Sequence, residues 1–152
     1  MEYGSISREI RIEATPEVVY QVISSPEHLR EWWPDEADLE TPEPGATGTV
    51  RFGSGSSAKV ELLTVVEADP PRRFAFRWVG EEGQAPGPGN SLLVTFDLVP
   101  DGDGTLLRFS EAGFRERGWE AAVLEEAYRD HARGWDHFLP RLAGYAAEVA
   151  TR

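Results

Sequence analysis

The sequence predicts an α+β fold, in which a curved antiparallel sheet of six or seven strands wraps around one long C-terminal helix and two short helices follow the first strand. Two observations lead to this prediction. Between about Trp119 and Ala150 apolar residues recur at steps of three and four, which indicates one helix of roughly 45 Å. Upstream, apolar residues alternate along short segments that are separated by turns, which is typical of hairpin-connected strands. One long helix beside such a sheet must cover its apolar face.

The first elements are a strand and two short helices. Residues 6–14 alternate between isoleucine and polar residues, which predicts a strand. Thr15 and Pro16 then begin a helix, because threonine caps a helix and proline fits its first position. Ser-Pro-Glu at residues 25–27 repeats this signal, and the second helix is expected to end near residue 31, before two tryptophans and a proline.

A meander of strands follows. Residues 35–48 are acidic and proline-rich, which predicts a loop with a short edge strand near Leu39. The glycine- and proline-rich residues 81–90 predict the clearest loop of the chain, and residues 83–89 are expected to be its most mobile internal segment, because their prolines and glycines leave little side chain to pack. The predicted strands are at residues 49–52, 58–68, 74–79, 92–99 and 105–111, with turns at 53–57, 69–72 and 101–104.

The last element is the long helix, whose apolar stripe is rich in aromatic residues. His131, Trp135 and Phe138 lie on this stripe and are expected to face the sheet. Pro140 removes one backbone donor, so a kink is predicted near the middle of the helix, and Gly134 adds flexibility there.

Length and composition predict one domain over residues 1–152. We expect a cytoplasmic protein, and both a monomer and a homodimer stay open. The chain has 15 basic and 27 acidic residues, and its net charge of −12 opposes binding to nucleic acids and to anionic membranes. It has no apolar signal segment and no run of about 20 apolar residues that could insert into a membrane. A single lysine beside many arginines hints at a GC-rich bacterial genome.

No metal or cofactor is predicted. The histidines are His28, His131 and His137, and none of their spacings places two ligands on one metal from a helix or a strand. The chain has no cysteine to act as a thiolate ligand or a nucleophile. It also lacks a nucleophile elbow and a phosphate-binding glycine loop, so binding is favoured over catalysis.

Two inward-facing polar residues are candidates for a site. Glu111 has the inward parity of the last strand, where a carboxylate must be paired, hydrated or protonated. It could form a structural pair with Arg8 of the first strand, anchor a ligand, or become exposed by strand-end twist. His131 could be a core histidine with satisfied nitrogens, or a group that contacts a ligand or handles a proton.

Several motifs occur in the order and at the spacing of one known family. They are Ala14-Thr15-Pro16-Glu17-Val18-Val19-Tyr20, Trp32-Trp33-Pro34, Val66-Glu67-Ala68-Asp69-Pro70-Pro71-Arg72-Arg73-Phe74 with Trp78, Gly104-Thr105-Leu106-Leu107, Gly113-Phe114 and Gly134-Trp135. Through these motifs the chain resembles a bacterial family within the START and birch-pollen-allergen (SRPBCC) superfamily. The family is named after the activator of the ninety-kilodalton heat-shock chaperone's ATPase. The resemblance covers nearly the whole chain and implies a helix-grip fold. Two residues depart from it: Glu111 stands where the family often has histidine, and Pro140 is unusual in the closing helix.

The resemblance implies a cavity between the sheet and the long helix, where many relatives bind apolar or lipid-like small molecules. The first hypothesis is therefore a binder of an apolar or aromatic small molecule. The residues expected to contact the ligand are Trp32, Trp33, Phe76, Trp78, Phe96, Phe109, Glu111, His131, Trp135 and Phe138.

Two other functions are implied by relatives, because the fold does not fix the function. One is a co-chaperone that binds the heat-shock chaperone, although 152 residues leave no room for the additional N-terminal domain of the two-domain eukaryotic activator. The other is a cyclase or hydrolase that acts on aromatic polyketide-like substrates. In that case Glu111 and His131 would be the acid–base pair.

Overall fold

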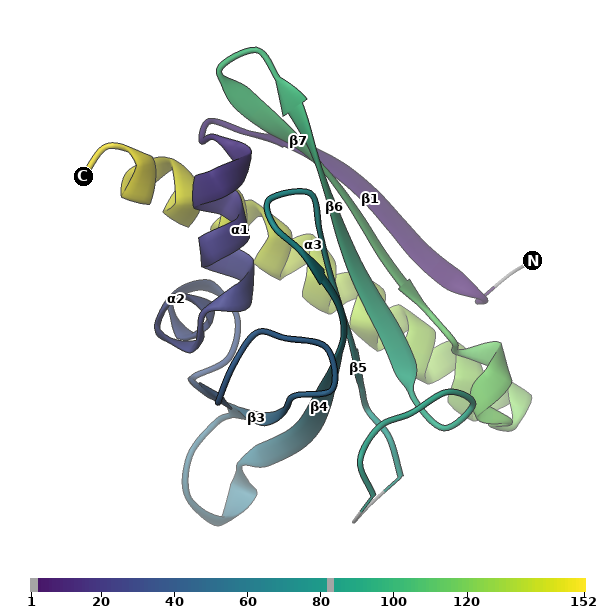
Figure 1. The fold of residues 1–152 in the computed structure, drawn as a ribbon. Coiled ribbons are helices and arrows are strands. Elements are labelled where there is room, and N and C mark those ends of the chain that lie inside the picture. Colours follow the sequence, from purple (N-terminus) through teal and green to yellow (C-terminus); the bar gives the residue numbers. More distant parts are fainter. Residues whose placement is uncertain (1–2, 82–83) are drawn as a thin grey trace.

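The computed structural model of the protein describes residues 3–81 and 84–152. Its seven antiparallel strands are ordered β1-β7-β6-β5-β4-β3-β2 and curve around a long C-terminal helix (Figure 1). Two short helices follow the first strand, so the predicted α+β helix-grip fold is confirmed. The elements are β1 (Ser5–Ile12), α1 (Pro16–Ser24), α2 (Pro26–Trp32), β2 (Glu36–Leu39), β3 (Thr47–Phe52), β4 (Lys59–Asp69), β5 (Arg73–Trp78), β6 (Leu92–Asp101), β7 (Gly104–Ala112) and α3 (Ala121–Ala150), with 3-10 turns at Gly55–Ser57 and Arg115–Arg117.

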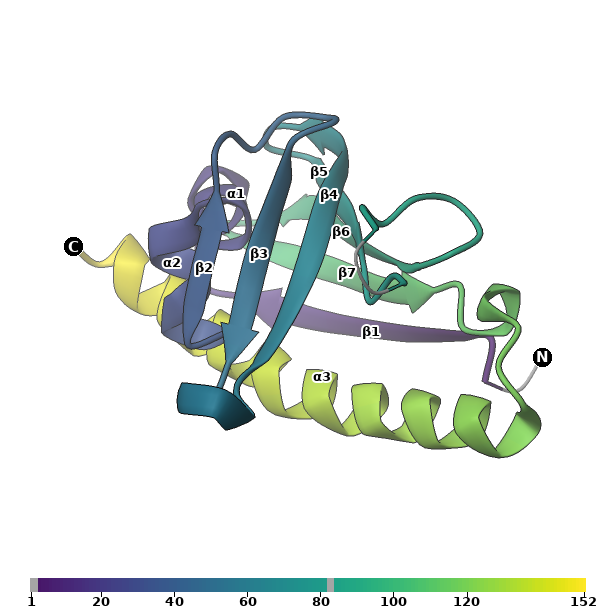
Figure 2. The same cartoon turned by 90° about the horizontal axis from the view of Figure 1, so that it is seen from below.

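Both short helices begin where the sequence predicts. The Thr15 hydroxyl accepts a hydrogen bond from the backbone N–H of Val18 at 3.4 Å, and Pro16 occupies the first turn of α1. Trp32 ends α2, and its indole Nε1 donates to the backbone carbonyl of Val22 at 3.0 Å. This bond ties α2 to α1. Both helices lie beside the C-terminal part of α3 (Figure 2).

Helix α3 is unbroken from Ala121 to Ala150 and starts two residues later than predicted. Pro140 lies inside it, on the exposed side, where water can bind the carbonyl that the missing N–H leaves free. The proline therefore does not interrupt the helix. The residues that α3 buries most completely are Trp135, Leu139, Leu142 and Ala146.

The hydrophobic core fills the concave side of the sheet. Phe74, Phe96 and Phe109 lie on three neighbouring strands, and each is at most 2% exposed. Helices α1 and α3 cover this face (Figure 1). No helix in the described part of the chain is long and apolar enough to cross a membrane.

One predicted contact, the pair of Arg8 and Glu111, is wrong. In the β1–β7 ladder Ile6 lies opposite Glu111, and Arg8 lies two residues further along β1, opposite Phe109. The long Arg8 side chain instead reaches α3, where its Nε donates to Asp136 Oδ1 at 2.7 Å. This hydrogen bond lowers the pKa of the Asp136 carboxyl below its ordinary value.

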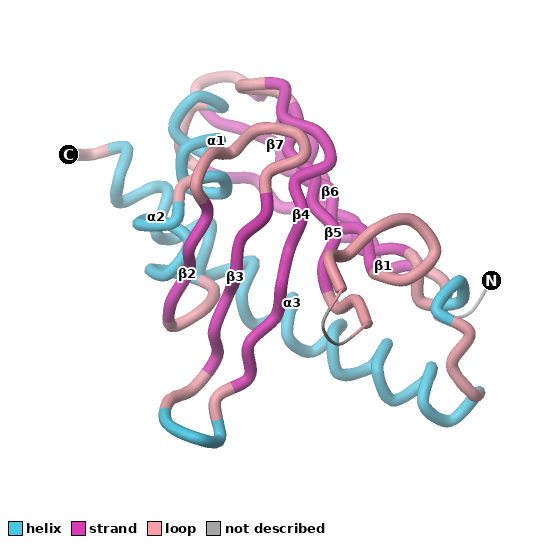
Figure 3. The backbone as a smooth tube through the Cα atoms, turned by 60° about the horizontal axis from the view of Figure 1, so that its bottom comes forward, coloured by secondary structure: helices cyan, strands magenta, loops and turns pink. Residues whose placement is uncertain are grey.

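The glycine- and proline-rich segment between β5 and β6 is a loop, as predicted, although Gly83 lies outside the described residues. The rest is more anchored than its composition suggests. Pro86 is buried, the Gly87 N–H donates to Asn90 Oδ1 at 2.8 Å, and Ser91 Oγ donates to the Gly87 carbonyl at 2.6 Å. Figure 3 shows the loop as a pink arch beside β5 and β6.

Candidate ligand-binding cleft

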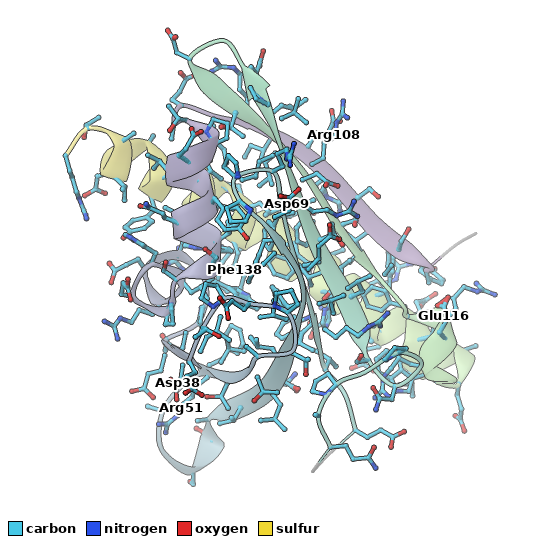
Figure 4. All side chains as sticks on the ribbon, viewed as in Figure 1. Asp38, Arg51, Asp69, Arg108, Glu116 and Phe138 are labelled. Atoms are coloured by element: carbon cyan, nitrogen blue, oxygen red, sulfur yellow. The ribbon has the colours of Figure 1, made fainter. Side chains whose placement is uncertain are left out.

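A cleft of about 160 Å³ opens between the inner face of the sheet and α3. Strands β3, β4 and the end of β5 form one wall, and the middle of α3 forms the other. Phe138 from α3 points toward β3 (Figure 4), with its ring 6.4 Å from that of Phe52. The residues lining this sheet–helix cleft are Trp33, Phe52, Lys59, Glu61, Trp78, Val79, Asp130, His131, Gly134, Trp135 and Phe138.

Trp33 joins the two walls. It follows α2 and turns its indole into the interior, where it is 5% exposed. Its ring centroid lies 4.9 Å from that of Trp78 on the sheet, 5.3 Å from that of Trp135 on the helix and 5.8 Å from that of Phe52. Such tilted and edge-on contacts are favourable for aromatic rings. The apolar part of the cleft is therefore a rigid group of rings.

A buried carboxylate lies behind these rings. Glu111 is 0% exposed, and its two oxygens accept three hydrogen bonds from side chains. Trp78 Nε1 donates to Oε2 at 2.7 Å, Trp135 Nε1 donates to Oε1 at 2.9 Å, and His131 Nδ1 lies 2.8 Å from Oε1. A buried carboxylate needs such donors, and here they come from β5 and α3. Glu111 therefore fixes the indoles and the imidazole that face the cleft.

The imidazole of His131 is oriented by this contact. Its Nδ1 must carry a proton to donate to the carboxylate, so the neutral ring presents Nε2 as an acceptor. His131 lines the cleft, and its side chain is 14% exposed. Nε2 has no partner among the described residues, so it is free to accept a hydrogen bond from a bound molecule.

A second polar group faces the cleft from β4. Glu61 lies opposite Val50 in the β3–β4 ladder, and Val50 is 1% exposed, so both point to the inner face. Burial raises the pKa of the Glu61 carboxyl, while the charges of Lys59, His131 and Arg117 oppose this shift. Within the described residues, this carboxylate accepts no hydrogen bond and forms no ion pair.

The sequence from residue 13 to residue 147 matches the model of the family described as activator of Hsp90 ATPase homolog 1-like protein. The match spans most of the chain. The chain belongs to this family.

Solved structures share the fold of this family member. MLL2253 from Mesorhizobium loti is 24% identical with a TM-score of 0.75, covering 95% of this chain and 97% of that chain. Aha1 from Colwellia psychrerythraea is 21% identical (TM-score 0.70; 91% and 92% covered), and CalU16 from Micromonospora echinospora is 23% identical (TM-score 0.65; 93% and 65% covered). At these identities the likeness shows the fold alone. No curated protein matches the chain.

The residues that we expect to contact a ligand divide into two groups in this family member. Trp33, Trp78, His131, Trp135 and Phe138 line the cleft. The others lie deeper and are at most 2% exposed: they are Trp32 at the end of α2, and Phe76, Phe96, Phe109 and Glu111 on the inner face of β5–β7. Contact of either group with a ligand stays a prediction.

Several cleft residues were missed by the sequence reasoning. Strand β4 is apolar on both faces, with Val60 and Leu62 outside and Leu63 inside, so alternation does not reveal that Lys59 and Glu61 point inward. Only the register with β3 decides this. The other cleft residues not foreseen are Phe52, Val79, Asp130 and Gly134.

Val79 carries a backbone feature of its own. Its φ of 54° lies in the left-handed region, which a β-branched residue rarely adopts, and this strained residue directly follows β5 at the cleft. The cleft offers no metal site. In the part of the chain that the structure describes, no three His, Asp or Glu side chains are grouped closely enough to hold a metal ion.

Proposed function

We propose that the protein binds an apolar or aromatic small molecule in the sheet–helix cleft. The observation that carries this proposal is the cleft itself, which five aromatic rings line together with two acceptors, Glu61 and His131 Nε2, that have no hydrogen-bond partner within the described residues. Small-molecule sites combine apolar walls with a few polar groups in this way. A cavity of about 150 Å³ accommodates benzene, so a cleft of about 160 Å³ suits a single aromatic ring. A longer ligand would extend from the open side.

Blocking the cleft tests this proposal. Gly134 lines the cleft, and a Cβ added there meets nothing within 4 Å, so Gly134→Leu places a side chain in the space that a ligand would take. The substitution also favours the helix, because leucine is a better helix former than glycine. Gly144→Leu is the matched control, since Gly144 lies in the same helix, is exposed and is equally open.

The readout is calorimetric titration of the full chain with benzyl alcohol and larger neutral aromatic compounds. We expect saturable binding by the unmodified protein and by Gly144→Leu, and an affinity at least about tenfold lower in Gly134→Leu. Equal binding by all three proteins would place the ligand elsewhere. Binding by none would overturn the proposed function.

The Glu111–His131 contact supports a second candidate, a cyclase or hydrolase with an aromatic polyketide-like substrate. A histidine held by a carboxylate is arranged to accept a proton through its other nitrogen. One structural neighbour, DynU16, is described as a protein of the dynemicin biosynthetic locus; it is 22% identical, and this chain covers 46% of it. Turnover of aromatic ester and polyketide panels that is lost in His131→Gln would favour the enzyme over the binder.

The family name supports a third candidate, activation of the heat-shock chaperone's ATPase. A chaperone pull-down with an ATPase assay tests it, and stimulation that survives Gly134→Leu would separate it from ligand binding.

The Colwellia psychrerythraea neighbour is described as an Aha1 dimer. We extend dimerisation to this chain as a proposal, and light scattering over a concentration series tests it.

A further inference from the structure

We propose that the sheet–helix cleft selects a ligand whose aromatic ring carries an amine, bound as an ammonium ion, over neutral or carboxylate analogues. This inference rests on the proposed ligand-binding function and concerns the chemical class of the ligand. Two polar groups of the lining residues have no hydrogen-bond partner in the part of the chain that the structure describes: the Glu61 carboxylate on the sheet wall and His131 Nε2 on the helix wall. Both are hydrogen-bond acceptors, so the molecule that completes them must bring donors.

An ammonium group brings donors and a positive charge together. A partly buried carboxylate without a partner is unfavourable, and a cationic donor relieves this cost better than a hydroxyl does. Burial also raises the pKa of the Glu61 carboxyl, because its charged form is poorly solvated there. A carboxylate ligand, by contrast, would add a third acceptor to two that are already unsatisfied.

The aromatic walls favour the same ligand. Trp33, Trp78 and Trp135 line the cleft and pack against one another with ring centroids 4.9 to 6.2 Å apart, and a cation is attracted to the face of such a ring. Glu111 lies behind two of these indoles and adds negative charge without using cleft space. The net charge of −12 for the whole chain further favours cations over anions.

Two other charged residues, Asp130 and Lys59, also line the cleft. Asp130 is acidic but forms an ion pair with Arg133 at 2.9 Å. Lys59 lies two residues from Glu61 on the same face of β4 and is exposed, so it is the protein's own cation nearest in sequence to the free carboxylate. A ligand ammonium therefore competes with Lys59. Removal of Lys59 and removal of Glu61 must change amine affinity in opposite directions.

The test compares benzylamine, benzyl alcohol and phenylacetate, which share one ring and differ in charge, by calorimetric titration of the full chain at pH 7. We expect benzylamine to bind about tenfold more tightly than benzyl alcohol, and phenylacetate to bind most weakly. Glu61→Gln should reduce benzylamine affinity about tenfold and change benzyl alcohol affinity by less than about twofold. Lys59→Gln should increase benzylamine affinity.

Glu40→Gln is the matched control, because Glu40 is an exposed carboxylate that follows β2, at the end of the β2–β3 hairpin away from the cleft residue Phe52. It removes the same charge and should leave all three affinities unchanged. Benzyl alcohol binding as tightly as benzylamine, or an unchanged benzylamine affinity in Glu61→Gln, would overturn this inference and leave the proposed function standing. Binding of none of the three compounds would overturn both.

Discussion

The carboxylate of Glu111 shows how one residue shapes the cleft without lining it. We predict that Glu111→Gln destabilises the protein by about 1.5–3 kcal/mol, since an amide replaces one acceptor oxygen by an NH2 that meets an indole or imidazole N–H. Urea unfolding measures this, with the exposed Glu40→Gln as the control. A loss no larger than that of the control would mean that the three hydrogen bonds contribute little.

The role of Glu111 in holding His131 has a separate readout. Nitrogen NMR shifts of the His131 imidazole should report the Nδ1–H tautomer in the unmodified protein, because Nδ1 donates to the carboxylate. In Glu111→Gln we expect a mixture of tautomers, since an amide oxygen holds the proton less strongly. The same spectrum in both proteins would mean that Glu111 does not set the tautomer of His131.

Glu61 gives a prediction on pH. Because burial raises its folded-state pKa above the ordinary 4.5, protonated Glu61 favours folding. This contribution is fully present below the unfolded pKa and is lost as pH rises through the folded pKa, since the folded state then binds more protons than the unfolded state. The gain in stability of Glu61→Gln over the unmodified protein should therefore be larger at pH 7 than at pH 4. Urea midpoints at both pH values check this, and a difference that does not grow with pH would contradict it.

At the scale of elements, the contact of α3 with the sheet depends on Trp135. It is 2% exposed, its ring centroid lies 4.5 Å from that of Phe109, and its indole donates to Glu111. Trp135→Ala should cost about 3–5 kcal/mol of unfolding free energy, because it leaves a large cavity in this interface. Phe138→Ala, at the edge of the cleft, should cost less. Chemical denaturation measures both, and a loss under about 1 kcal/mol for Trp135→Ala would mean that the interface repacks.

The loop between β5 and β6 gives a second prediction at this scale. Amide hydrogen exchange should be fast at Ala85, which is exposed, and slower at Gly87, whose N–H donates to Asn90. Asn90→Ala should accelerate exchange at Gly87 and leave Ala85 unchanged. Uniformly fast exchange in the unmodified loop would show that this anchor is not maintained in solution.

At the scale of the whole molecule, the net charge of −12 acts on any charged ligand. If the cleft binds benzylamine, its affinity should fall as salt rises, because exposed acidic residues that attract it are screened. Benzyl alcohol affinity should stay nearly constant over the same series. Titrations from low to high sodium chloride check this, and equal salt responses for the two compounds would mean that the long-range field contributes little.

The family assignment also belongs to this scale. A match over residues 13–147 depends on motifs spread across the chain, and the order of those motifs is what made the resemblance visible in the sequence. The solved neighbours confirm the same architecture at 21% to 24% identity. Function is not carried over by this likeness, because related folds present different side chains to the same cavity.

The sequence by itself determined the elements and, where apolar residues recur regularly, the faces that they bury. Apolar spacing located α3, Thr15 and Ser25 marked the starts of α1 and α2, and alternation in β7 placed Glu111 inside. These features are local, since periodicity and capping depend on residues within a few positions of one another.

Only the tertiary structure decided which residues face the cleft and which partner holds Glu111. Phe76 and Trp78 share one face of β5, yet only Trp78 reaches the cleft, and Glu61 points inward on a strand that is apolar on both sides. Which side chains reach the cleft depends on how far the curved strands β3 and β4 lie from α3. That separation follows from the twist of the sheet and from ring contacts around Trp33, which join residues distant in the chain and leave no periodic signal in the sequence.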